Sequence, residues 1–334
     1  MVSVPIQLLI VIGANICFFY LKEGFFPRLL FFVGSIACWI FLIFRGLDAK
    51  RKDYVGRTKE HKLSDAPNYS MFELSCGRKS VRKYDPAKPV EESVIASLKA
   101  WCKTDENLVG PFGSKIRIEI VESKEMVNGK VGTYGMISGA NVFAVVVKDE
   151  KTKTKMLGTF DGKSLKKQLV LNEKESVFMV SPIGYEAEGC VMFSSNVLKA
   201  SKTFVAVLAS RVTGSKLRIP FSKFCLRGSI NSTDGVNAYT DVPVIGEALE
   251  AAHWAPSSAG KQPTRAVIKE EGGKWVVQFY EAKDVLHNNG VDSGISIGNF
   301  DLTLKEKGIT GKITIESGVD QNDLYNYTGT WRQD

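Results

Sequence analysis

The first 46 residues are far more apolar than the rest of the chain, and they constrain its fold most strongly. Residues 4–21 form an apolar segment of 18 residues with only two strongly polar side chains, and residues 29–44 form a second segment of 16 residues with none. A helix needs about 20 apolar residues to cross a bilayer, with a lower limit of roughly 17. We therefore predict a membrane anchor, either a transmembrane helical hairpin whose flanking arginines snorkel or a single span.

The residues that flank these segments predict the orientation of the anchor. A secretory signal peptide is disfavoured because residues 1–7 carry no basic side chain and no cleavage site of small residues follows, which leaves a re-entrant segment as the other alternative. The segment 45–62 is rich in Lys and Arg, whereas the loop between the apolar segments carries two basic residues. Because cytoplasmic flanks are the basic ones, we expect the large domain in the cytosol. Residues 4–44 and the basic segment 45–62 would then contact membrane lipid.

Three glycosylation sequons provide a test of that orientation, because they would be modified in a lumenal domain and silent in a cytosolic one. They begin at Asn68, Asn231 and Asn326.

Composition narrows the class of the remaining chain. With 334 residues, 44% of them apolar, the protein is globular, and its formal charge of +8 is a moderate surplus. The positive charge is diffuse except beside the predicted membrane anchor, so no nucleic-acid binding is expected. The sequence has neither a G-x-S-x-G elbow nor a phosphate-binding P-loop. Six cysteines show no paired metal spacing, and the histidines are not spaced as zinc ligands: His61, His253 and His287.

Periodicity predicts a mixed α and β domain after residue 69. An amphipathic helix is predicted after Pro89, with apolar residues at helical spacing: Val94, Ile95, Leu98 and Trp101. Alternation predicts a half-buried strand at 113–123, and a β-branched run predicts a central strand at 141–149. A polar helix from residue 160, a strand at 176–185 and a helix at 190–210 are expected to follow.

A weak internal repeat divides this domain into two related halves. Residues 89–101 and 241–254 are both proline-led helices that end in tryptophan, and each precedes a proline-containing loop and a strand. A strand at 274–282 and a helix at 291–308 complete the second half, where Gly294 and Gly298 leave one helical face free for close approach. The predicted order is a membrane anchor at 1–46, a basic linker at 47–68, a first half at 69–225, a polar linker at 226–241 and a second half at 242–334.

Five segments in this order resemble the nitroreductase family, most closely its single-chain subgroup with two fused nitroreductase-like halves. They are "RKSVRKYD" at 78–85, "VGTYGMISGANVFAVVV" at 131–147, "PIGY" at 182–185, "AAHWAPSSAGKQP" at 251–263 and "VDSGISIGNF" at 291–300. The resemblance covers residues 69–331. It implies an α+β fold with a central, mostly antiparallel sheet flanked by helices, and a pseudo-dimer within one chain for which a monomer is sufficient.

The resemblance also implies a cofactor, flavin mononucleotide (FMN), with NAD(P)H as electron donor and a small nitro compound, quinone or similar molecule as acceptor. Arg78, Ser80 and Arg82 alternate, so in an extended segment two guanidinium forks and a hydroxyl could clasp the phosphate. Lys216 and Arg218 resemble a second basic pair on the same phosphate. The break at Ala255-Pro256 ends a helix and opens a loop that resembles the one against the flavin ring: Pro256, Ser257, Ser258, Lys261 and Gln262.

Three departures from the family favour an alternative, a degenerate module that binds flavin or serves as a membrane-tethered scaffold. Gly260 stands where many relatives have asparagine, and Thr264 where they have tryptophan. Residues 148–155 alone connect two segments that the family separates by a long helix, so we expect the strand at 141–149 to expose apolar surface. No side chain is predicted to act as a catalytic acid or base, and His253 is expected to be a helix-face residue.

Overall fold

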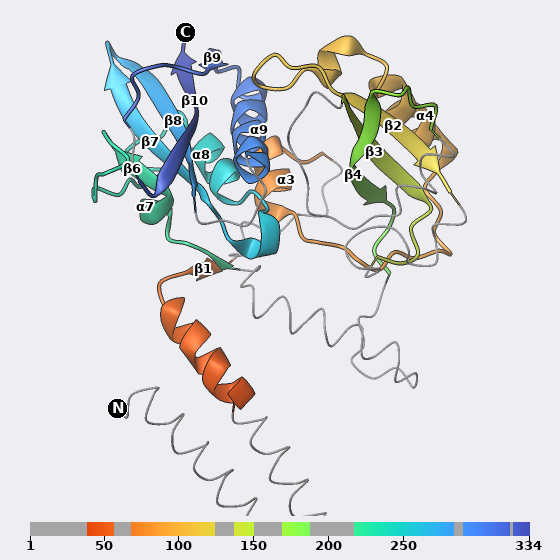
Figure 1. Cartoon of the computed structure of the whole chain (residues 1–334), viewed down its shortest axis with the longest axis horizontal. Helices are drawn as coiled ribbons and strands as arrows, with labels where there is room; N and C mark the ends of the chain where they lie inside the picture. Colours follow the sequence, from red (N-terminus) through yellow and green to blue (C-terminus); the bar gives the residue numbers. More distant parts are fainter. Residues whose placement is uncertain are drawn as a thin grey trace, which may run out of the picture. The chain divides into compact units, whose positions relative to one another are not determined.

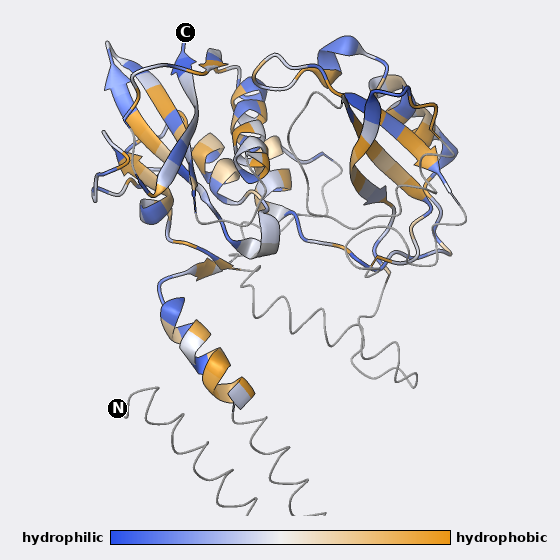
Figure 2. Cartoon of the chain, viewed as in Figure 1, coloured by the Kyte–Doolittle hydropathy of each residue, from blue (hydrophilic) through white to orange (hydrophobic). Residues whose placement is uncertain are grey.

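The computed structural model describes residues 39–56, 68–123, 137–149, 169–187, 217–283, 290–320 and 323–334. The chain divides into two compact units, 1–54 and 55–334. Most of the predicted membrane hairpin lies outside the described residues. Residues 39–50 form a helix that is apolar at its start and polar toward its end (Figure 2), and the Arg45 guanidinium lies 5.9 Å from the centre of the Phe41 ring. Among the helices that can be described, none has both the length and the apolarity that a span requires.

The unit 55–334 has the predicted α+β composition, but its described strands form separate sheets and not one central sheet (Figure 1). Strand pairing between distant segments decides this partition, and local periodicity carries no information on it. A two-stranded antiparallel sheet joins β1 (Val55–Gly56) to β5 (Leu217–Arg218). The other two sheets have three and five strands.

The three-stranded sheet is antiparallel and belongs to the first half. Its strands are β2 (Arg117–Glu122), β3 (Val142–Asp149) and β4 (Glu175–Ile183), with β3 in the middle as predicted. Apolar side chains along β3 are buried or half-buried, so the expectation that this strand exposes apolar surface is wrong. The reason is that its two faces pack into different clusters, one around Phe143 and Val145 and one around Val142.

The helix predicted after Pro89 is α4 (Glu92–Trp101), but it packs more loosely than its apolar pattern suggests. Ile95 is buried in a cluster with Val142. Val94 and Trp101 remain 42% and 48% exposed. The short turn η1 (Asp105–Leu108) follows. The four apolar residues at helical spacing therefore predicted this helix correctly. The width of its buried face depends on its packing against the sheet, which the spacing does not specify.

The five-stranded sheet belongs to the second half and has the order β6-β7-β8-β10-β9, with β6 parallel to β7 and the other pairs antiparallel. The strands are β6 (Cys225–Arg227), β7 (Thr264–Glu271), β8 (Lys274–Ala282), β9 (Gly311–Thr314) and β10 (Tyr325–Gln333). Helices α8 (Gly246–His253) and α9 (Val291–Glu306) pack against each other beside this sheet (Figure 1). Its core contains aromatic rings packed edge to face, with the centre of the Phe300 ring 5.3 Å from that of Phe279 and 5.4 Å from that of Trp331.

Residues 226–241, predicted to be a linker, pack into the second half. The short helix α7 (Phe221–Phe224) leads directly into β6. The Val236 N–H then donates to the Cys225 carbonyl at 3.0 Å, and Val236 and Ala238 are buried. Polar composition predicted a linker here, but a few apolar side chains and main-chain hydrogen bonds are enough to hold the segment against the sheet.

Helix α3 (Met71–Gly77) also crosses the predicted boundary. A capping box closes its start, since Ser70 and Glu73 each accept a hydrogen bond from the other's main-chain N–H. The helix packs against α8 and α9, and the Met71 N–H donates to the Glu306 carboxylate at 2.8 Å. The first residues of the predicted first half therefore complete the helical layer of the second half.

Candidate functional site

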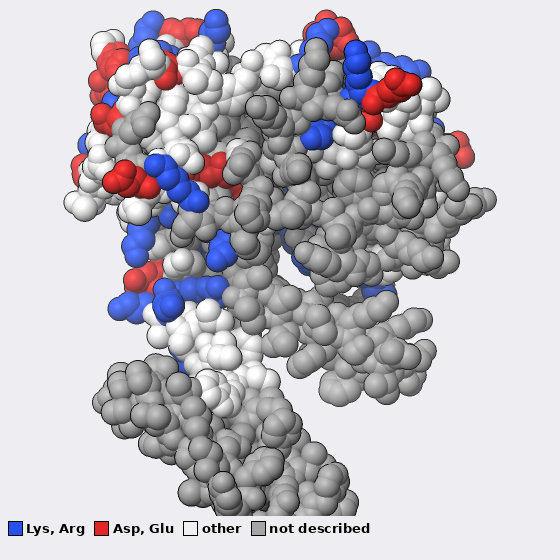
Figure 3. Space-filling model, viewed as in Figure 1, with Lys and Arg blue, Asp and Glu red and all other residues white. Residues whose placement is uncertain are grey.

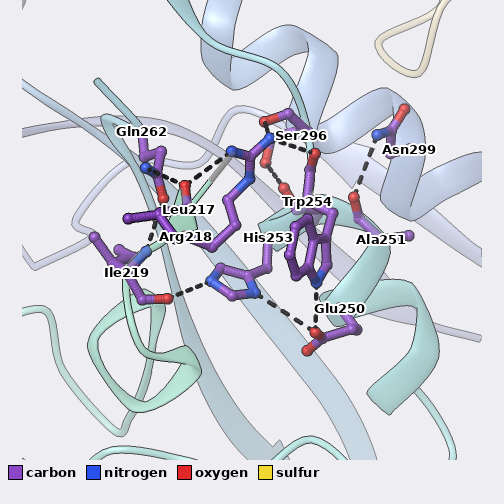
Figure 4. A network of polar contacts seen from close by, with 12 residues as sticks. Leu217, Arg218, Ile219, Glu250, Ala251, His253, Trp254, Gln262, Ser296 and Asn299 are labelled. Atoms are coloured by element: carbon purple, nitrogen blue, oxygen red, sulfur yellow. Dashed lines mark hydrogen bonds and ion pairs between the residues drawn. The ribbon is translucent and has the colours of Figure 1, made fainter. Parts of the chain in front are cut away.

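The loop that follows α8 is held by the side chain of Gln262. Its Oε1 accepts a hydrogen bond from the Ile219 N–H at 2.8 Å, and its Nε2 donates to the Leu217 carbonyl at 3.0 Å (Figure 4). Its main-chain N–H donates to Ser257 Oγ at 2.8 Å. Gln262 has a φ of 52°, in the left-handed region that non-glycine residues seldom adopt. The side-chain amide therefore makes the two hydrogen bonds that the main chain of a neighbouring strand would make along residues 217–219. These bonds fix the C-terminal end of the loop.

The end of α8 is capped by side chains from β5 and α9. Carbonyls in the last turn of a helix have no i+4 N–H partner within the helix. The donors are Asn299 Nδ2 to the Ala251 carbonyl at 3.2 Å, Ser296 Oγ to Ala252 at 2.6 Å and Arg218 Nη2 to Trp254 at 3.0 Å (Figure 4). The Arg218 guanidinium also lies 5.2 Å from the centre of the Trp254 ring. A cation at a helix C-terminus is favoured by the helix dipole, so these contacts fix the N-terminal end of the loop.

His253 is buried in the last turn of α8, where it serves the structure of the site. Its Nε2 lies 2.7 Å from the Ile219 carbonyl, which can only accept, so Nε2 carries the proton. Its Nδ1 lies 3.7 Å from Glu250 Oε1, and that oxygen accepts a hydrogen bond from Trp254 Nε1 at 2.7 Å. The helix-face position predicted for His253 is confirmed, and the side chain is 1% exposed.

Asp292, in the first turn of α9, faces the same loop. Both of its carboxylate oxygens lie 3.1 Å from the Ser258 N–H. Burial raises the pKa of this carboxyl, while the hydrogen bond from Ser258 lowers it. On β8, burial raises the pKa of Glu281, with a smaller contribution from the charge of Asp292, and Glu281 accepts from the Gly290 N–H at 2.7 Å. A small cavity lies here, lined in part by His253, Ser257, Gln262, Thr264, Asp292 and Ser296.

Of the site residues predicted in the second half, the structure brings most into this loop. Pro256, Ser257 and Ser258 are half-buried, and the short turn η4 (Ser258–Gly260) carries Lys261, which is exposed, at its end. Arg218 lies beside them but is 3% exposed. Lys216 lies outside the described residues.

Three of the site residues predicted in the first half, Arg78, Ser80 and Arg82, lie on the segment after α3. Arg78 is half-buried at the end of α3, whereas Ser80 and Arg82 are exposed and Val81 packs against the core between them. Main-chain bonds hold the segment, since the Ser138 N–H donates to the Arg82 carbonyl at 3.0 Å. Within the described residues, no hydrogen bond or ion pair joins Ser80 or Arg82 to the loop after α8.

Sequence reasoning missed the residues that support the loop. Asp292, Ser296 and Asn299 lie at i, i+4 and i+7 of α9, so they share the helical face that meets α8 and the loop. The available signal was a polar stripe along one face of the helix predicted at 291–308. Glu250 and Trp254 carried no such signal, because an i, i+4 pair is common on any helix.

Comparison with known proteins gives little beyond this geometry. No protein-family model matches the sequence, and a search of curated proteins found no match. A crystal structure of a protein from Thermotoga maritima, provisionally described as a nitroreductase, is similar to the chain with a TM-score of 0.41 and 16% identity. The similarity covers 83% of this chain and 98% of that one. Similarity at this level carries no argument, so the function must be inferred from the residues of the site.

Proposed function

We propose that the chain is a membrane-anchored, FMN-dependent oxidoreductase of the nitroreductase type, which passes hydride from NAD(P)H to a small acceptor. The observation that carries this proposal is the loop Pro256–Gln262. Its ends are fixed by Arg218 and Gln262, while Ser257 and Ser258 remain partly accessible and Lys261 is exposed. Fixed hydrogen-bonding groups and a cation on a rigid loop are what a protein uses to orient a flavin and tune it. The resemblance of five segments to nitroreductases supports the same ligand.

The available side chains fit such a ligand in part. Ser80 and Arg82 are exposed and, with Arg78, supply a hydroxyl and guanidinium forks suited to a phosphate. Apart from α9 itself, no atom of the described residues lies within 4 Å of a Cβ added at Gly294 or Gly298, so these residues leave that face of α9 open to a flat ring. Bound FMN would supply the hydride chemistry. The chain's own contribution is to hold the phosphate, orient the ring and place the Lys261 charge near it.

Arg218 does not fit the phosphate role that the resemblance implies. Its guanidinium is buried and donates to carbonyls at the end of α8. The side-chain amide of Gln262 likewise already bonds the main chain of Leu217 and Ile219. These two observations favour a second candidate function, a degenerate nitroreductase-like module that acts as a membrane-tethered flavin-binding or scaffold protein.

Flavin retention tests the proposal. The full chain, purified in detergent, is incubated with FMN and desalted, and its absorbance near ~450 nm is recorded. We expect the flavin bands to persist in the wild type and to disappear in the double variant Arg78→Ala plus Arg82→Ala. Lys103→Ala plus Lys174→Ala, which removes two exposed charges elsewhere in the first half, is the charge-matched control and should retain flavin. A folded wild type that stays colourless would refute flavin binding.

Turnover then separates the enzyme from the binding module. Oxidation of NADH or NADPH in the presence of a quinone or a nitroaromatic acceptor is expected of the enzyme. A flavin-loaded protein that oxidises neither nucleotide would favour the module.

Membrane attachment and orientation are part of the same proposal. We propose that residues 4–44 anchor the chain, that the basic segment 45–62 contacts anionic lipid and that the large domain faces the cytosol. The sequons at Asn68, Asn231 and Asn326 should then stay unmodified in cells. A mass shift that a glycosidase removes would contradict the cytosolic orientation.

A further inference from the structure

The turn at the centre of the loop takes its cap from a distant residue. Ser258 is the first residue of η4, and the N–H groups of a first helical turn need an acceptor. The preceding Ser257 makes no capping bond, because its Oγ accepts instead from the Gln262 N–H. The acceptor for the Ser258 N–H is the carboxylate of Asp292, 34 residues further along the chain.

This contact links the middle of the loop to α9, whereas the bond from the Gln262 N–H to Ser257 Oγ stays within the loop. Arg218 fixes the chain at Trp254 and Ala255, and the side chain of Gln262 fixes it to β5. Asp292 binds the segment between these two points, where Ser257 and Ser258 lie. Asp292 itself is held in place, because it lies in the first turn of the 16-residue helix α9 and is 4% exposed.

We propose that Asp292 is a positioning residue that holds the serine loop in its ligand-binding conformation, and that it does so in its ionised form. The identity of the ligand rests on the proposed function, while the loop contact itself does not. An ionised carboxylate accepts from an N–H roughly twice as strongly as a neutral group does. The N-terminal end of α9 favours a negative charge at this place.

Acid is expected to release the loop. Burial raises the pKa of Asp292, so this carboxyl takes up a proton at a higher pH than an exposed aspartate as the solution is acidified. Charged or ionisable groups on the packed elements are Glu281 on β8, Glu250 and His253 on α8, and Arg218 on β5. Of these, Glu281 has a pKa that is itself raised by the charge of Asp292, after burial.

The sign of the change in global stability distinguishes a residue that positions the loop from one that only supports the fold. A carboxyl with a raised pKa binds its proton more tightly in the folded state, so its ionisation lowers global stability as pH rises through that pKa. Replacing Asp292 by the isosteric, uncharged asparagine should therefore leave global stability near neutral pH unchanged or higher. The same substitution should loosen the loop, and a residue that only supported the fold would show the opposite pattern.

Hydrogen exchange of the full chain in detergent, read by mass spectrometry, tests this without any ligand. In Asp292→Asn, peptides covering residues 255–263 should exchange about tenfold faster at neutral pH, while peptides of β8 keep their wild-type protection. The wild-type loop should lose protection as pH falls, after correction for the intrinsic rate, and the variant should show no such change. Asp301→Asn, a buried aspartate of the same helix that pairs with Lys305 at 2.8 Å, is the matched control. Equal loop protection in wild type and Asp292→Asn would overturn the proposal.

FMN titration of the same proteins keeps the two proposals distinguishable. We expect Asp292→Asn to weaken FMN binding by about tenfold and Asp301→Asn to leave it unchanged. A loosened loop with undiminished FMN affinity would overturn the positioning role. A wild type that binds no FMN would refute the proposed function, and the exchange result would still decide whether Asp292 holds the loop.

Discussion

The two halves contain the same local motif with opposite outcomes. Helices α4 and α8 both follow a proline and lead into a tryptophan, a loop and a strand, yet Trp101 is 48% exposed and Trp254 is 1% exposed. Helix α8 is buried along almost its whole length, with α3, α7 and α9 packed against it, whereas α4 buries one residue, Ile95. The loop after a helix is fixed only when the end of that helix is packed against its neighbours. The second half therefore supports the candidate site.

The cores of the two halves differ in the same direction. Among the described residues, the largest fully buried side chains include Phe143 in the first half, and the others lie in the second. Strand β4 is half-buried over almost its whole length. Side chains in a close-packed core have little conformational freedom. The loop after α8 is therefore attached to a rigid core, which the loop after α4 lacks.

The largest effect is expected from truncating Trp254, and truncating Trp101 provides the comparison from the first half. Trp254→Ala should lower the free energy of unfolding by about 3–5 kcal/mol, because it removes a buried ring and leaves the Glu250 carboxylate without its indole partner. Trp101→Ala should cost less than about 1 kcal/mol. Chemical denaturation of the full chain in detergent, followed by circular dichroism, measures both. Similar costs for the two substitutions would break the contrast between the halves.

A smaller effect, of opposite sign, is expected on the open face of α9. Gly294→Ala should stabilise the protein by about 0.5–1 kcal/mol, because alanine favours the helix and no described residue outside α9 lies within 4 Å of the added Cβ. If the flavin ring lies on this face, the same substitution should weaken FMN binding. Ser97→Ala, at an exposed position of α4, is the control from the first half. Unchanged FMN affinity in Gly294→Ala would place the ligand elsewhere.

The smallest effects are expected from two surface arginines, one in each half, on a surface where both signs of charge are interspersed (Figure 3). Arg117 pairs with Glu119 and Glu175, at 2.9 and 2.8 Å, and Arg332 pairs with Glu316 and Glu271, both at 2.6 Å. Because the arginine side chains are 38% and 44% exposed, Arg117→Met and Arg332→Met should each cost less than about 1 kcal/mol, with less effect at high salt. A cost of several kcal/mol for either would mean that the pair is far better shielded than its exposure implies.

The Arg332 network also has a defined pH dependence. Its hydrogen bond holds the pKa of Glu316 below the usual range, so the stabilisation is present above the ordinary glutamate pKa and is lost as pH falls through the lowered value. Denaturation of wild type and Arg332→Met between about pH 6 and pH 3 should therefore show the difference between them shrinking with acid. A difference that stays constant would contradict this assignment.

Local sequence patterns predicted most of the elements and a smaller part of the site. The strands at 142–149 and 274–282 and the helix at 291–306 lie where periodicity placed them, because side-chain spacing reports directly on backbone geometry. Predictions that depended on distant contacts failed more often. The described strands form separate sheets where one central sheet was expected, and residues 226–241, predicted as a linker, pack into the second half. Strand pairing and the packing of polar segments depend on partners far along the chain.

The sequence by itself determined that a helix ends before Pro256, that proline and glycine shape the following loop, and that serine, lysine and glutamine populate it. Only the tertiary structure decided what those groups bind. Gln262 meets β5 45 residues away, Arg218 meets the end of α8, and Asp292 meets Ser258. A guanidinium or an amide can donate hydrogen bonds either to a phosphate or to a carbonyl. The acceptor that the fold brings within reach therefore decides the role of the residue, and a linear sequence does not specify that acceptor.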